Sequence, residues 1–151
     1  MRRLVMMVSA LAACGGAERD GSGFRIEVGA LSLPGVSDAR YRLEILGADG
    51  TVVSSNAAVD SDRYGDGRGS IAYVAGCDAR NNPHTIELEL IGLWADGEPV
   101  PDGDWIPPGV IRREAICAPD ADTRVRFDLV VARTAEQGFF DVAVPFEDIF
   151  C

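Results

Sequence analysis

Residues 40–55, RYRLEILGADGTVVSS, decide the fold class. Every second residue from position 41 to position 45 is apolar and the residues between them are charged, which is typical of a strand with one face in the core and one in water. An Asp49-Gly50 pair then separates this run from a second apolar run. Such a pair favours a tight turn between antiparallel strands, so the segment predicts a β-hairpin.

The same period of two recurs along the rest of the chain. Phe24, Ile26 and Val28 alternate with charged residues, and the further candidate strands cover residues 70–76, 85–94, 110–117, 123–132 and 139–144. No segment after the first 14 residues shows apolar residues at helical spacing. The pattern favours an all-β fold, an antiparallel β-sandwich of immunoglobulin-like type. A closed β-barrel is the alternative, because periodicity does not reveal closure.

The N-terminal residues, MRRLVMMVSALAACGG, form a different kind of segment. Two arginines precede an apolar run at residues 4–13, which is about half of the roughly 20 residues that a membrane-spanning helix requires. A positive start, a short apolar middle and small residues at the end are the parts of a secretory signal peptide. The alternatives are cleavage as a plain secretory peptide, with Cys14 an incidental thiol, and a buried N-terminal helix.

Leu11-Ala12-Ala13-Cys14 resembles the lipobox of bacterial lipoproteins. The resemblance implies cleavage before Cys14, fatty chains on its sulfur and amine, and attachment to a membrane through this anchor. Because Gly15 follows the cysteine where Asp would favour the inner membrane, it also implies an outer-membrane location. The expected organisation is a signal peptide at residues 1–13, a flexible tether at 14–23 and a β-sandwich domain at 24–151.

The remaining cysteines are Cys77, Cys117 and Cys151. Export brings a chain into an oxidising compartment, and Cys77 and Cys117 both end apparent strands, so we expect a disulfide between them. Two buried free thiols are the alternative. The tail ends at Cys151 like a strand cut short, which favours a chain truncated at the C-terminus. Residues 133–151 are similar to the C-terminal part of uncharacterised secreted lipoproteins of myxobacterial and deltaproteobacterial type, a resemblance that implies no activity.

The charge of the chain excludes one class of partner. The formal net charge is −10, and removal of Arg2 and Arg3 with the signal peptide takes it to −12. An acidic body repels phosphate backbones and has no basic footprint for DNA or RNA. We therefore expect no nucleic acid partner.

Two loops are weak candidates for ligand sites. Asp60, Asp62 and Asp66 lie in the loop DSDRYGDGRG, but the positions that complete a calcium loop hold Tyr64 and Ile71, which favours a solvated acidic turn. Trp94 and Trp105 lie near the ends of a proline-rich loop at residues 93–109. They form either a stacking surface for a sugar ring or a packed base that closes the core.

Catalytic signals are weaker still. The only histidine, His84, lies in the turn-like NNPHT and is expected to be a solvated loop residue. There is no G-x-S-x-G nucleophile elbow, and Glu87 and Glu89 fit the outward face of a strand. The sequence predicts a membrane-anchored envelope lipoprotein that is not an enzyme, needs no cofactor and uses its sandwich for binding or structure. A carbohydrate- or calcium-binding module on the cell surface is the alternative.

Overall fold

The computed structural model describes residues 22–31, 33–134 and 140–142 of the 151-residue chain. The signal peptide, Cys14 and Cys151 of the sequence predictions lie outside the described residues, as does most of the tether. In chain order the strands are β1 (Gly23–Val28), β2 (Val36–Leu46), β3 (Val52–Asp60), β4 (Ile71–Gly76), β5 (His84–Ala95), β6 (Glu98–Pro99), β7 (Trp105–Ile106), β8 (Val110–Ala115), β9 (Asp122–Phe127), β10 (Ala132–Thr134) and β11 (Phe140–Val142). One helical turn, α1 (Ser61–Tyr64), connects β3 to β4.

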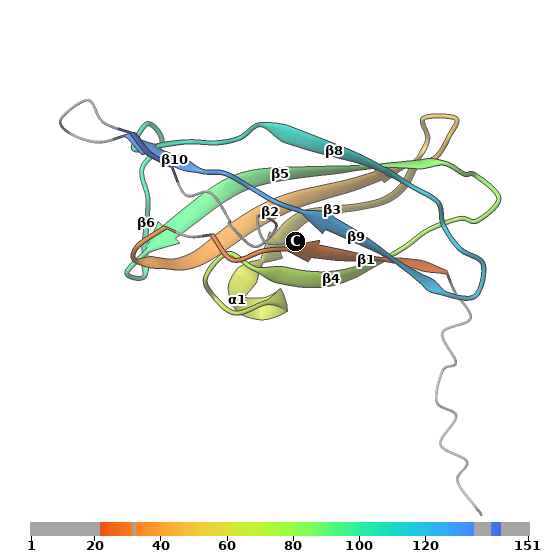
Figure 1. Cartoon of the computed structure of the whole chain (residues 1–151), viewed down its shortest axis with the longest axis horizontal. Coiled ribbons are helices and arrows are strands. Elements are labelled where there is room, and N and C mark those ends of the chain that lie inside the picture. Colours follow the sequence, from red (N-terminus) through yellow and green to blue (C-terminus); the bar gives the residue numbers. More distant parts are fainter. Residues whose placement is uncertain (1–21, 32, 135–139, 143–151) are drawn as a thin grey trace, which may run out of the picture.

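Two sheets pack as a sandwich (Figure 1). The larger sheet has the order β3-β2-β5, with β8 paired to the first half of β5 and β6 to its end. The smaller sheet has the order β4-β1-β9, and a short third sheet has the order β11-β10-β7. The described strands thus form separate sheets, which confirms the all-β sandwich and not the closed barrel.

One pairing departs from the purely antiparallel sandwich that the sequence predicts. Among the described strands, β1 and β9 run parallel, with Ile26 opposite Val125. These strands are far apart in the sequence, so no hairpin fixes their relative direction. The pairing places the first strand of the two packed sheets beside the last of them in chain order.

The core consists of the inward-facing residues of both sheets. The alternating sets predicted for residues 24–28, 41–45, 86–90 and 125–131 are buried throughout. The largest fully buried side chains include Phe24, Tyr41 and Phe127. Burial of this apolar surface is the main force that holds the two sheets together.

The run at residues 123–132 is not the single strand that the alternation predicts. Strand β9 ends at Phe127 and β10 begins at Ala132. Leu129 and Val131 between them are still buried. Alternating burial therefore continues past the end of the hydrogen-bonded ladder, which the sequence pattern does not distinguish from a strand.

Strand β3 is an edge strand of the larger sheet and is irregular. Its ladder with β2 shifts register twice, once opposite Arg42 and once opposite the step from Ile45 to Leu46. At each shift β3 carries one residue more than β2, which is a β-bulge. Near the first bulge the side chain of Asn56 accepts a hydrogen bond from the amide of Ala58. Among the described strands, β3 pairs with β2 alone.

None of the described residues forms a helix with the length and apolar character needed to span a bilayer.

Candidate functional site

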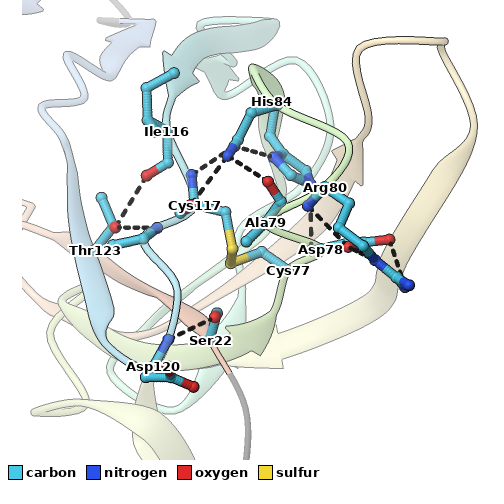
Figure 2. The surroundings of a disulfide bond; sticks show 12 residues. Ser22, Cys77, Asp78, Ala79, Arg80, His84, Ile116, Cys117, Asp120 and Thr123 are labelled. Atoms are coloured by element: carbon cyan, nitrogen blue, oxygen red, sulfur yellow. Dashed lines mark hydrogen bonds and ion pairs between the residues drawn. A yellow bond between two sulfur atoms is a disulfide. The ribbon is translucent and has the colours of Figure 1, made fainter.

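A disulfide joins the two sheets at one end of the sandwich (Figure 2). Cys77 directly follows β4 of the smaller sheet, and Cys117 lies just after β8 of the larger one. Their sulfurs are bonded, with the two Cα atoms 6.0 Å apart. The predicted pairing is thereby confirmed over the alternative of two free thiols. Cys117 is fully buried and belongs to the core.

The start of β1 is held at the same end. The amide of Cys77 donates a hydrogen bond to the carbonyl oxygen of Ser22 at 3.2 Å. The amide of Asp120 donates to the Oγ atom of Ser22 at 3.1 Å. The chain therefore enters the sandwich beside the disulfide.

His84 does not lie in solvent, and the expectation of a solvated loop residue is wrong. It is the first residue of β5 and is fully buried. Its ring contacts that of Phe24 edge to face, with the ring centroids 5.3 Å apart. His84 is in phase with Ile86 and Leu88, so the alternation that predicts β5 would have placed it inside if followed one step further back.

Both ring nitrogens of His84 have hydrogen-bond partners. The amide of Asp78 lies 3.4 Å from Nε2, and the Oδ1 atom of Asn82 lies 3.2 Å from Nδ1. Since Asn82 Oδ1 also accepts a hydrogen bond from the amide of Cys117 at 2.7 Å, it is an oxygen acceptor. These contacts assign the proton to Nδ1 and the lone pair to Nε2, which is a neutral imidazole.

Asn82 connects this histidine to the disulfide. Besides the bonds at its Oδ1 atom, its Nδ2 atom donates to the carbonyl oxygens of Ala79 at 2.9 Å and Cys117 at 3.0 Å. The side chain of Asn82 thus bonds the loop at residues 77–84 to Cys117, two residues after the end of β8. A buried polar network of this kind is stable because every member is satisfied. Two features of the sequence pointed to a buried His84: its place in the alternation with Ile86 and Leu88, and a nearby asparagine, Asn82, that could satisfy its ring.

The three acidic residues Asp60, Asp62 and Asp66 lie in and around α1. The carboxylate of Asp60 forms an ion pair with Arg40, and the amide of Asp62 donates to the side chain of Asp38. Within the described ranges, no three acidic, histidine or cysteine side chains meet in a way that could hold a metal ion. The three residues belong to an acidic turn. This turn contains the helical turn α1, which the sequence pattern did not predict.

Asp66 shapes the loop that follows α1. Its Oδ1 atom accepts hydrogen bonds from the amides of Arg68 at 2.7 Å and Ser70 at 3.2 Å. Burial opposes ionisation of Asp66, but the hydrogen bonds from Ser70 and Arg68 outweigh burial and lower its pKa. The carboxylate is therefore used within the turn itself.

We expect calcium to leave the stability of the protein unchanged. A ligand that binds only the folded state raises the melting midpoint by mass action, and the carboxylates of the acidic turn do not converge on one point. Thermal melts in millimolar calcium chloride and in EDTA test this. A midpoint that rises with calcium concentration would restore the calcium loop as a binding site.

The two tryptophans have different environments. Trp105 is 6% exposed and belongs to the core, as the packing alternative predicts. Trp94 is half-buried, with the guanidinium of Arg40 5.0 Å from its ring centroid. Its ring also covers the backbone of Gly92, where an added Cβ would lie 2.9 Å from the ring. Because one ring is buried, the pair does not form the exposed platform that stacking on a sugar requires.

Glu87 and Glu89 lie on the outward face of the larger sheet, as the alternation predicts, and both form ion pairs there. Arg112 contacts Glu87 at 2.7 Å, and Arg42 contacts Glu89 at 2.8 Å. Arg42, Glu87 and Glu89 line a shallow open groove together with Glu44 and Val110. Exposed pairs of this kind contribute little to stability, about 0 to 1 kcal/mol each.

The described residues do not assemble a familiar catalytic arrangement around the histidine. The single histidine of the chain bonds to a backbone amide and an asparagine rather than to a hydroxyl or a thiol. No protein-family model matches this chain, and no match was found among curated proteins or solved structures.

Proposed function

We propose that the protein is a lipid-anchored component of a bacterial cell envelope whose β-sandwich domain has a binding or structural role and catalyses no reaction. The anchor is Cys14, the last residue of the lipobox-like sequence Leu11-Ala12-Ala13-Cys14. The proposed address is the outer membrane, with the domain outside the cytoplasm. Three fatty chains on one cysteine bind a bilayer far more tightly than the marginal attachment that one chain gives.

The observation that carries the proposal is the Cys77–Cys117 disulfide in a chain that begins with a lipobox-like segment. Disulfides form and persist in oxidising compartments outside the cytoplasm, so a disulfide and an export signal support each other. The sulfur–sulfur bond is a feature of the folded sandwich, whereas the export signal lies in the first 14 residues of the sequence. Their agreement favours an exported, anchored domain over a cytoplasmic one.

A role without catalysis is supported by how the polar side chains of the described residues are used. His84 and Asn82 hold a loop, Asp66 holds a turn, and the arginines and glutamates on the larger sheet pair with one another. Here the polar groups bond to the protein itself, as in a scaffold.

Replacement of the anchor residue tests the proposal. We expect Cys14→Ser to abolish incorporation of labelled fatty acid and to move the protein out of the outer-membrane fraction, because serine has no sulfur to carry a lipid. Labelled fatty acid and the intact mass of the protein report whether the lipid is attached, and membrane fractionation reports where the protein is located. Cys151→Ser is the matched control, since it removes another cysteine and leaves the lipobox intact. Native protein that keeps Met1, or an unmodified sulfur at Cys14, would refute the anchor.

A further inference from the structure

The imidazole of His84 is held in a place that accepts only its neutral form. The ring is fully buried and contacts the ring of Phe24 edge to face. Asp78 and Arg80, from the loop that precedes β5, lie near it (Figure 2). Its Nε2 lone pair faces the amide hydrogen of Asp78. A proton added at Nε2 would set two donors against each other and leave the amide of Asp78 without its acceptor.

We propose that His84 is an acid-operated latch: its protonation releases the loop at residues 78–82 and gives solvent access to the Cys77–Cys117 disulfide. The latch is a property of the sandwich and does not depend on the lipid anchor.

The geometry connects the ring to the disulfide in two ways. Asp78, whose amide faces Nε2, is the direct neighbour of Cys77 in the chain. Asn82, which bonds to Nδ1, also bonds to the amide and the carbonyl oxygen of Cys117. Displacement of Asp78 and Asn82 would therefore remove contacts beside both sulfurs while the two sheets stay packed.

The charged groups around His84 act in opposite directions. The carboxylate of Asp78 favours the imidazolium form, but Arg80 forms an ion pair with that carboxylate at 3.1 Å. The neighbours from the other packed elements are Phe24 of β1, Ala115 of β8 and Cys117, which carry no charge. Burial outweighs Asp78 and lowers the pKa of His84 below its usual 6.5.

The sign of the pH effect follows from this direction. The unfolded or released histidine takes up a proton at higher pH than the buried one does. The closed loop is therefore fully stabilised above about pH 6.5 and loses stability as the pH falls below that value. Acid opens the latch and neutral pH closes it.

Two measurements on the wild-type protein test the latch between about pH 7.5 and about pH 5. The first is hydrogen exchange, expressed as protection factors so that the pH dependence of intrinsic exchange is removed. The second is the rate of disulfide reduction by a water-soluble phosphine, divided at each pH by its rate with a small unstructured disulfide so that protonation of the phosphine cancels. The phosphine attacks one sulfur; the two sulfurs leave as thiols, and the phosphorus is oxidised with oxygen from water. We expect the protection of the Asp78 amide to fall several-fold and the reduction rate to rise several-fold in acid.

His84→Gln is the matched variant. The side-chain oxygen of glutamine keeps an acceptor for the Asp78 amide and does not titrate in this range. We expect its reduction rate, relative to that of the small disulfide, to be independent of pH. If this variant fails to fold, NMR of the wild-type imidazole decides, because ring titration and loss of Asp78 protection must share one midpoint.

Three outcomes would overturn the latch. In the first, the imidazole stays neutral across the whole pH range. In the second, it titrates while the protection of the Asp78 amide and the reduction rate stay constant. In the third, the amides of β1 and β5 lose protection together with that of Asp78, which is global unfolding and not release of one loop.

Discussion

Replacing Cys77 and Cys117 together by serine is expected to lower the free energy of unfolding by about 4 kcal/mol. The disulfide closes a loop with a sequence separation of 40 residues, and the chain-entropy model gives this value for a loop of that length. The effect is large because the bond restricts the unfolded chain, while in the folded protein it ties the ends of two different sheets. One covalent bond thus accounts for a large part of the 5–15 kcal/mol that is usual for a domain.

Urea unfolding followed by tryptophan fluorescence measures this effect. The denaturant dependence should also become steeper, because an unfolded chain without the cross-link is more expanded. Wild-type protein unfolded in the presence of a reductant serves as the control and should match the double variant. An unchanged unfolding midpoint in the double variant would show that the bond contributes nothing to stability.

Phe24→Ala is expected to cost about 3 to 5 kcal/mol, the second large effect. Phe24 is fully buried on β1, the central strand of the smaller sheet, and its ring contacts His84. Truncation removes apolar contact area and leaves a cavity between the two sheets, since a strand hydrogen-bonded on both sides has little freedom to move inward.

Val74→Ala is the matched control for this substitution. Val74 lies on β4, next to β1 in the same sheet, but it is 52% exposed. Its truncation should change the free energy of unfolding by no more than about 0.5 kcal/mol. Equal losses at Phe24 and Val74 in the same urea experiment would mean that the inward face of β1 does not form the core.

The strands were predictable because a period of two reports directly on which face of a strand is buried. Residues 24–28 and 41–45 have their alternating apolar residues in the core. The pattern carries no information about which strand lies beside which. The parallel pairing of β1 and β9 therefore had no signal in the sequence, and neither did the end of β9 at Phe127, where burial continues without a ladder.

The disulfide was predictable from chemistry, whereas the network beside it was not. Export and two cysteines at strand ends suffice to expect Cys77–Cys117. His84 was assigned to solvent because asparagines and a proline precede it, a composition typical of turns. The side chain of Asn82 and the amide of Asp78 satisfy its ring nitrogens, so the histidine is buried without an unpaired polar group. Such partners become visible only when the loop is folded.

The bulges of β3 have a consequence for contacts between copies of the protein. Residues 52–59 contain no charged side chain, and a regular edge strand of this composition would be a template on which neighbouring molecules polymerise. The extra residues break the spacing of its outward N–H and C=O groups, so a second chain finds no long uninterrupted row to pair with. The irregular backbone of β3 therefore opposes edge-to-edge pairing between copies along a strand segment that has no charged side chain of its own.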